Sequence, residues 1–122
     1  MADSLKYSKD HEWIREEGDL AVVGVTEFAA EQLGDVVYVD LPEVGDTVEA
    51  HTEMGEIEST KSVSDLFSPL TGEVVEVNQD VIDEPEKVNE DPLGDAWLIK
   101  VKVESLPDDL MTKDEYDKLT QQ

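Results

Sequence analysis

One lysine, Lys61, stands in a short polar segment with Ile57 on one side and Val63, Leu66 and Phe67 on the other. The segment S-T-K-S (59–62) follows Ile57 and precedes Val63. A polar tip between segments of strand-forming residues is typical of a β-hairpin. The pattern therefore predicts a lysine hairpin over about residues 53–77 that presents a single primary amine to solvent. Most lysines are only solvated surface charges, so the amine needs further evidence before a role is assigned to it.

A second turn is expected after the hairpin. Pro69 restricts φ and Gly72 accepts the left-handed backbone conformations that tight turns often need. Val74, Val75 and Val77 then predict a further strand.

Other residues capable of chemistry are not arranged for catalysis. The two histidines, His11 and His51, lie far apart in the sequence and outside any ligand-spaced motif, so no metal site is expected. The chain has no cysteine and lacks the glycine-rich phosphate loops and the G-x-S-x-G motif. An exposed lysine that carries an attached group makes fewer demands on the protein than a catalytic centre does.

Composition narrows the class of protein. The 122 residues fit one domain, 1–122, and contain 32 acidic against 9 basic residues, a formal net charge of -23. Such a surface repels phosphate backbones, so nucleic acid is not expected as a partner. No apolar run approaches the roughly 20 residues of a membrane span, and the first residues do not resemble a signal peptide. We therefore expect a cytoplasmic protein of a prokaryotic host, with no membrane contact.

The acidity itself has two interpretations. It can steer the protein towards basic partner surfaces, or it can be an adaptation to a salty cytoplasm, where carboxylates keep the protein hydrated. The few lysines and the wide scatter of acidic residues favour the second interpretation.

The first third of the chain predicts strands and one helix. His11 to Ile14 has strand composition, the segment E-E-G-D (16–19) predicts a turn, and residues 20–25 predict a second strand. Thr26 is a suitable N-cap for a short helix that Gly34 ends. The apolar run within 35–41 predicts a strand that is buried on both faces.

The rest of the chain predicts further strands and a terminal helix. Residues 45–48 are a turn into a strand, and the acidic stretch 78–92 is the longest excursion, with Pro85 where one helical turn could start. In the last strand, alternation places one set of side chains in the core, namely Trp97, Ile99, Val101 and Val103. The opposite set is Leu98, Lys100 and Lys102.

Thr112 and Glu115 form a capping-box pattern for a C-terminal helix over about 112–121, within which Leu110, Tyr116 and Leu119 are expected to pack. Many short strands with close turns predict a mainly β protein, a sandwich or flattened barrel with two small helices on its rim.

Four ordered blocks of the chain resemble the glycine cleavage system H protein family. They are K-Y-S-K-D-H-E-W-I-R (6–15), G-V-T-E-F-A-A-E-Q-L-G-D-V-V-Y-V-D-L-P (24–42), the segment around E-S-T-K-S-V-S-D (58–65), and D-A-W-L-I-K-V (95–101). The resemblance covers nearly the whole chain. It implies a barrel-sandwich hybrid of two antiparallel sheets, the fold of lipoyl and biotinyl carriers, with short peripheral helices and a C-terminal helix. It also implies that Lys61 carries lipoic acid in amide linkage.

The resemblance further implies a carrier without turnover of its own. H proteins take the aminomethyl group of glycine from the pyridoxal-phosphate-dependent glycine decarboxylase (P protein) to the tetrahydrofolate-dependent aminomethyltransferase (T protein). Dihydrolipoamide dehydrogenase (L protein) then reoxidises the arm. A lipoate ligase or a lipoyl or octanoyl transferase must modify Lys61, and the carrier is expected to be a monomer.

Several residues are candidates for helping Lys61. The loaded arm is cationic and is held in a cleft in this family, so Glu12 in the H-E-W block is our candidate carboxylate, with Leu33 and Asp65 as further cleft residues. Glu58 and Asp65 are candidates for recognition by the ligase. Trp13 and Trp97 are expected in the core or the cleft wall.

Two other functions stay open at this point. An H-like protein can donate lipoate to other lipoyl-dependent complexes, and an unmodified acidic interaction module would use the hairpin as a binding edge.

Overall fold

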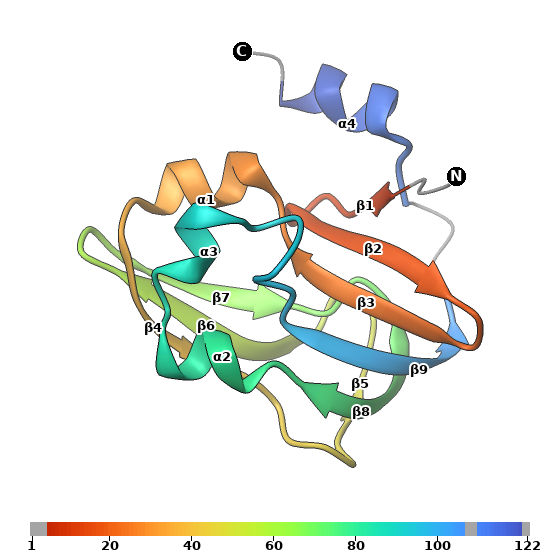
Figure 1. The fold of residues 1–122 in the computed structure, drawn as a ribbon. Helices are drawn as coiled ribbons and strands as arrows, with labels where there is room; N and C mark the ends of the chain where they lie inside the picture. Colours follow the sequence, from red (N-terminus) through yellow and green to blue (C-terminus); the bar gives the residue numbers. More distant parts are fainter. Residues whose placement is uncertain (1–4, 107–109, 121–122) are drawn as a thin grey trace.

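Two antiparallel sheets and four short helices make up the described part of the chain, residues 5–106 and 110–120 of a computed structural model (Figure 1). The six-stranded sheet has the order β1-β2-β3-β9-β8-β5, and the three-stranded sheet has the order β4-β6-β7. The strands are β1 (Lys6–Tyr7), β2 (Glu12–Glu17), β3 (Leu20–Val25), β4 (Val36–Asp40), β5 (Thr47–Val48), β6 (Glu53–Ser59), β7 (Val63–Phe67), β8 (Thr71–Val77) and β9 (Ile99–Ser105). The helices are α1 (Glu27–Leu33), α2 (Gln79–Asp83), α3 (Lys87–Glu90) and α4 (Lys113–Leu119). The predicted fold class is confirmed.

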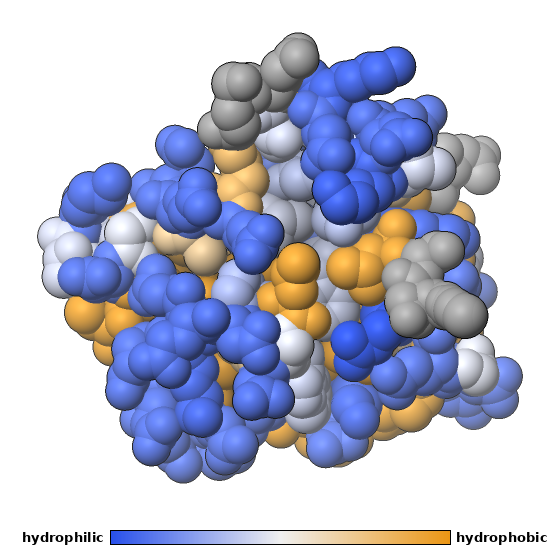
Figure 2. Space-filling model, turned by 45° about the horizontal axis from the view of Figure 1, so that its top comes forward, coloured by the Kyte–Doolittle hydropathy of each residue, from blue (hydrophilic) through white to orange (hydrophobic). Residues whose placement is uncertain are grey.

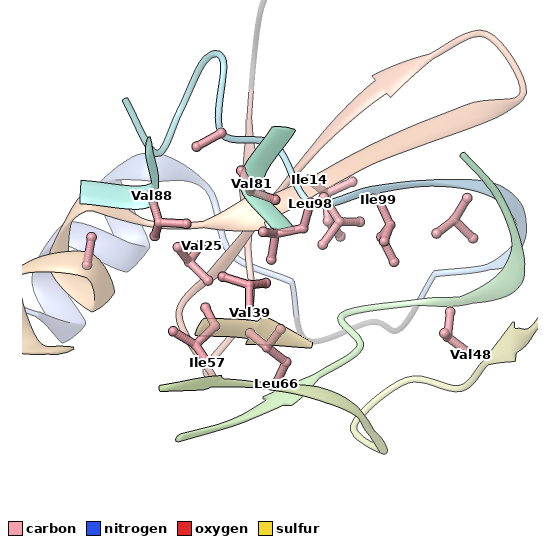
Figure 3. Packing of buried hydrophobic residues seen from close by; sticks show 14 of the residues in the cluster. Ile14, Val25, Val39, Val48, Ile57, Leu66, Val81, Val88, Leu98 and Ile99 are labelled. Atoms are coloured by element: carbon pink, nitrogen blue, oxygen red, sulfur yellow. The ribbon is translucent and has the colours of Figure 1, made fainter. Parts of the chain in front are cut away.

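The hydrophobic core lies between the sheets. Val39, Ile57 and Leu66 from the three-stranded sheet point towards Ile14 and Ile99 of the six-stranded sheet (Figure 3). All five side chains are buried, and removing most of one such side chain from a packed core costs about 2–5 kcal/mol. The core thus holds the lysine hairpin, of which Ile57 and Leu66 are part, firmly against the larger sheet.

The local signals of the first third of the chain give the predicted elements. Gly18 adopts φ 63° in the turn between β2 and β3. The Thr26 hydroxyl accepts a hydrogen bond from the Ala29 N–H at the start of α1. Gly34 ends the helix at φ 83°, and its N–H donates to the Ala30 carbonyl.

The prediction that β4 is buried on both faces is wrong. Val36 and Val39 are buried, but Val37 is 53% and Tyr38 48% exposed. The pairing of β4 with β6 shifts between Val36 and Tyr38, which marks a β-bulge. The additional residue of a bulge leaves the normal alternation of the strand. Two consecutive apolar side chains therefore reach solvent beside β6.

Gly72 also differs from its prediction, because it lies inside β8 and not in a turn. A Cβ atom at Gly72 would overlap the carbonyl oxygen of Lys102 on the paired strand β9. The glycine is thus needed for close approach of two strands. Pro69 does lie in the bend between β7 and β8.

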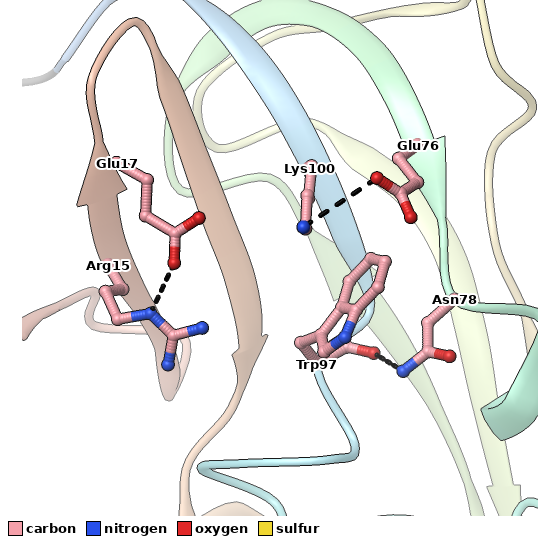
Figure 4. Close-up of polar contacts among 6 residues, drawn as sticks. All are labelled: Arg15, Glu17, Glu76, Asn78, Trp97 and Lys100. Atoms are coloured by element: carbon pink, nitrogen blue, oxygen red, sulfur yellow. Dashed lines mark hydrogen bonds and ion pairs between the residues drawn. The ribbon is translucent and has the colours of Figure 1, made fainter.

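The alternation predicted for the last strand fails at its first two residues. Leu98 is fully buried in the core, whereas Trp97 is only partly buried. The strand begins at Ile99, so the period of two does not extend back to these residues. Asn78 Nδ2 donates to the Trp97 carbonyl at 2.7 Å, and Lys100 Nζ lies 5.0 Å from the Trp97 ring centroid (Figure 4). From Ile99 onwards the predicted faces are correct.

The helices are more numerous than predicted. The stretch 78–92 contains α2 and α3, with Pro85 between them and α3 beginning two residues later. The capping box of Thr112 and Glu115 is present in both directions at the start of α4. Tyr116 packs as predicted, whereas Leu119 is exposed, and residue 121, the last of the predicted helix, lies outside the described residues.

The surface reflects the composition. Hydrophilic side chains cover most of the face seen in Figure 2, and hydrophobic ones reach it in separate patches. Within residues 5–106 and 110–120, no helix has the length and apolar character needed to cross a bilayer.

Candidate functional site

Lys61 lies in the tight turn that joins β6 to β7, and it is exposed. The turn is closed by the Ser59 N–H, which donates to the Ser62 carbonyl at 2.8 Å. The Ser59 hydroxyl oxygen accepts from the N–H groups of Lys61 and Ser62, both at 3.1 Å. Side-chain hydrogen bonds of this kind satisfy turn amides without a strand partner. The amine therefore projects from a backbone that is ordered up to the lysine itself.

A neighbouring segment braces this turn from outside the hairpin. The Thr60 N–H donates to the Asp35 carbonyl at 3.0 Å. On either side of Asp35, the Asn89 amide acts as a clamp: its Oδ1 accepts from Val36 N at 2.8 Å, and its Nδ2 donates to the Gly34 carbonyl at 2.7 Å. Sequence reasoning missed Asn89, since nothing local to α3 indicates a contact 55 residues away.

Gly34 also leaves room for the lysine side chain. A Cβ atom at Gly34 would lie 3.0 Å from Lys61 Cε, tighter than ordinary van der Waals contact. The aliphatic part of Lys61 thus passes over the glycine that ends α1. Gly34 thus ends α1 and also leaves the space that the Lys61 side chain occupies.

A cleft of about 340 Å³ begins beside the lysine turn. Ser62, the neighbour of Lys61, lines it. The cleft lies between α1, the start of β2 and the hairpin strands β6 and β7. It is lined by Asp10, His11, Glu12, Val25, Phe28, Ala29, Gln32, Leu33, Ile57, Ser62, Ser64, Asp65 and Leu66. The three residues expected at a cleft from the sequence, Glu12, Leu33 and Asp65, are therefore brought together around one cavity.

Glu12 is the buried carboxyl group of this cleft. Its side chain is 2% exposed, and the Ser8 hydroxyl donates to Oε1 at 2.7 Å. Burial raises the pKa of Glu12 from 4.5 to about 8; the Ser8 hydrogen bond opposes the rise, and the charge of Asp10 adds to it. A carboxyl group with this pKa is mostly protonated at neutral pH. A cation placed beside it would favour the ionised form.

His11 is a cleft residue that sequence reasoning did not assign. Its backbone has φ 68°, which is unusual for a residue other than glycine. Its Nδ1 lies 2.8 Å from the Tyr116 hydroxyl, which also makes a 2.7 Å hydrogen bond with Thr26 Oγ1. Burial lowers the pKa of His11, although the charge of Asp10 opposes this. A residue of α4 thereby holds one wall of the cleft in place.

Asp65 has a second set of neighbours besides the cleft. Its carboxylate lies within 4.8 Å of those of Glu53 and Glu56. The charge of Asp65 is the main cause of a raised pKa at Glu53. Glu58 lies on the same sheet, opposite Tyr38 on β4. The two residues predicted to meet a ligase therefore lie on the hairpin strands on either side of the lysine turn.

The tryptophans lie away from the cleft. Trp13 is fully buried, and its Nε1 donates to the Pro92 carbonyl at 2.9 Å. Trp97 packs against the same smaller hydrophobic cluster, which also contains Tyr7 and Tyr116. Of the two expected places, core and cleft wall, the structure gives Trp13 the first, whereas the partly buried Trp97 lies in neither.

Comparison with known proteins agrees with this architecture. The family model described as Glycine cleavage H-protein matches residues 5–122. A glycine cleavage system H protein of Streptomyces avermitilis is 61% identical over 113 residues, which is 92% of this chain and 90% of the relative. The protein of the same name from Carboxydothermus hydrogenoformans is 47% identical over 97% of this chain and 92% of the relative.

A solved structure extends the similarity to three dimensions. The crystal structure of a glycine cleavage system H protein from Mycobacterium marinum superposes with a TM-score of 0.91 at 43% identity, covering 98% of each chain. The match to the family model spans both sheets, the lysine turn and the cleft residues. The chain therefore belongs to the glycine cleavage H-protein family, as the four sequence blocks predicted.

Proposed function

We propose that this chain is the lipoylated carrier of a glycine cleavage system, with lipoic acid attached to Lys61 and with no catalytic turnover of its own. One arrangement carries the proposal. An exposed lysine stands on a braced hairpin, and a cleft that starts at its neighbour Ser62 contains the buried carboxyl group of Glu12.

The site fits a lipoyl group in two respects. Val25, Phe28, Leu33 and Ile57 give the cleft an apolar lining suited to a hydrocarbon chain and a dithiolane ring. The space over Gly34 lets the lysine side chain lie against α1 without a clash.

When attached, lipoate supplies a dithiolane that receives the aminomethyl group from the glycine decarboxylase and gives it to the aminomethyltransferase. Lys61 makes the attachment: its Nζ loses a proton and attacks the carbonyl carbon of an activated lipoyl adenylate. The bond from that carbon to the phosphate oxygen breaks, AMP leaves, and an amide forms. The amide has no charge, so the arm can lie on apolar surface at lower hydration cost.

Glu12 accounts for the selectivity of the cleft in this proposal. The cargo carries an ammonium group, and a carboxylate with few other partners is the side chain that best compensates a buried cation. Ser8 orients the carboxyl group, and the walls contributed by Leu33 and by Asp65 at the rim limit access of water. We therefore expect Glu12→Ala to leave lipoylation normal but to shorten the lifetime of the loaded form.

The partners in this proposal are the glycine decarboxylase, the aminomethyltransferase, dihydrolipoamide dehydrogenase and the enzyme that attaches lipoate. The last of these enzymes acts on Lys61 itself, and the other three act on the group that the lysine then carries. A rigid site on strands favours repeated, uniform encounters, because the attachment point moves little.

The test is a comparison of wild type with Lys61→Arg after incubation with lipoate, ATP and a purified bacterial lipoate ligase. Wild type should gain one lipoyl group by intact mass, whereas the arginine variant should gain none and keep its circular dichroism spectrum, because arginine does not form this amide. Modification of the variant at another lysine would refute the attachment site.

A second step tests the glycine cleavage role itself. The lipoylated protein, with its dithiolane in the oxidised disulfide form, is incubated with glycine, pyridoxal phosphate and a glycine decarboxylase; the S–S bond breaks as one sulfur takes the aminomethyl group and the other becomes a thiol. Gain of an aminomethyl group by intact mass supports the carrier role, whereas lipoylation without any such gain would overturn it.

A further inference from the structure

The outward face of the three-stranded sheet carries a row of three side chains beside the lysine turn. Tyr38 on β4 pairs with Glu58 on β6, and Glu58 pairs with Val63 on β7. Directly opposed residues on neighbouring strands point to the same face of a sheet. Tyr38 is 48% and Val63 60% exposed. The row therefore places one acidic side chain between two exposed apolar ones.

This end of the sheet concentrates exposed apolar surface. Six large hydrophobic side chains are exposed among residues 5–106 and 110–120, and three of them lie here: Val37, Tyr38 and Val63. The β-bulge puts Val37 on the surface next to Tyr38, and Val63 follows the lysine turn directly. In a chain with a net charge of -23, exposed apolar side chains gathered at one place mark an interaction site.

The same face is strongly negative. The next row, two residues further from the turn, consists of Asp40, Glu56 and Asp65. Neither row contains a lysine or an arginine. A partner that covers this face must therefore bring basic side chains around an apolar patch.

We propose that the Tyr38–Glu58–Val63 row, together with Val37, is the docking face for the enzyme that acylates Lys61, and that this enzyme meets it with a basic surface containing an apolar patch. The inference rests on the proposed modification of Lys61. It adds to that proposal which surface is recognised and by what chemistry.

The length of the lysine side chain identifies which enzyme must bind this face. The amine of an unmodified lysine lies one side-chain length from the backbone, so an enzyme that acylates it must contact the strands that flank the turn. Enzymes that act on the far end of an attached arm meet their group well away from the turn and do not need this face. The Tyr38–Glu58–Val63 row is adjacent to the turn, and only the enzyme that acylates Lys61 is obliged to bind there.

The test uses the double variant Tyr38→Thr/Val63→Thr. Threonine is β-branched and suits a strand, so the fold is expected to persist. Val44→Thr/Val75→Thr is the matched control, because both valines are exposed and neither is on the three-stranded sheet. Initial rates of lipoylation by the purified ligase are measured against carrier concentration, at saturating lipoate and ATP. We expect KM to rise about tenfold in the first variant with kcat unchanged, and to stay at the wild-type value in the control.

Charge is tested with Glu58→Gln. The KM of wild type should rise between about 0.05 and 0.3 M NaCl as screening increases, and the KM of Glu58→Gln should start higher and depend less on salt. Equal salt dependence in the two proteins would overturn the basic character assigned to the enzyme.

The remaining outcomes separate this inference from the proposed function. If wild type is lipoylated and the Tyr38→Thr/Val63→Thr variant has an unchanged KM, the docking face is wrong and the modification of Lys61 stands. If wild type is not lipoylated at all, the proposed function itself fails. The variant is also lipoylated to completion and assayed with the glycine decarboxylase, where its KM should equal that of wild type. A rise there without one for the ligase would assign the face to the decarboxylase and overturn the proposal.

Discussion

Glu12→Gln should remove a pH-dependent loss of stability. The pKa of Glu12 is about 8 in the folded protein against 4.5 as its ordinary value, because the side chain is buried. Below pH 4.5 both the folded and the unfolded chain hold the proton, so Glu12 makes no pH-dependent contribution there. Between these pH values the unfolded chain releases a proton that the folded protein keeps, so the free energy of unfolding falls as pH rises.

The size of the stability loss follows from the pKa shift of Glu12. Each pH unit in this window costs about 1.4 kcal/mol, so the loss between about pH 5 and pH 8 approaches about 4 kcal/mol as an upper value. Above the folded pKa both states are ionised and the loss stays constant. Glutamine is neutral throughout and can still accept the hydrogen bond from Ser8. The variant should therefore gain stability relative to wild type as pH rises.

The assay is urea unfolding of both proteins, followed by circular dichroism at several pH values and constant ionic strength. The other acidic groups titrate alike in the two proteins, so the difference between the two free energies isolates Glu12. Glu73→Gln, the same change at an exposed strand position, is the matched control. A difference for Glu12→Gln that stays constant from about pH 5 to pH 8.5 would refute the assignment of a neutral, buried Glu12.

Three further substitutions test the supports of the site. Gly34→Ala should lower the free energy of unfolding by about 1–3 kcal/mol, because alanine at this positive φ is strained. The added methyl group should also displace the Lys61 side chain, and unchanged NMR shifts of that side chain would show that it does not pass over residue 34. Asn89→Ala removes both hydrogen bonds of the clamp, so amide hydrogen exchange in the lysine turn should become several-fold faster. The free energy of global unfolding should fall by only about 1–2 kcal/mol. Equal exchange rates in the two proteins would mean that the turn does not depend on the clamp. Tyr116→Phe should cost about 1–2 kcal/mol and move the His11 ring resonances, and identical histidine spectra would show that α4 does not position the cleft wall.

The local elements of this protein follow from short stretches of sequence. Thr26 and Gly34 bound α1 through interactions within one helix length, and Thr112 and Glu115 do the same for α4. The lysine turn is likewise local, because its closing hydrogen bonds all involve Ser59. Interactions over three or four residues depend little on the rest of the fold, so composition and spacing were sufficient to predict them.

Errors arose where a residue's environment comes from a distant part of the chain. Gly72 resembles a turn residue until Lys102 is brought against it. The exposure of Val37 results from a bulge in the pairing of β4 with β6, and no local signal in β4 predicts it. Leu98 is buried because the strand starts one residue after it.

The sequence by itself determined the family and the turn that presents Lys61 to solvent, because these depend on residue type and near neighbours. Only the tertiary structure decided that Glu12 is buried with a raised pKa, that Asn89 clamps the segment beside the lysine turn, and that Tyr38 and Val63 flank Glu58 on one face. The physical reason is that burial, long-range hydrogen bonds and strand register are properties of pairs of segments, and the chain must fold before such pairs exist.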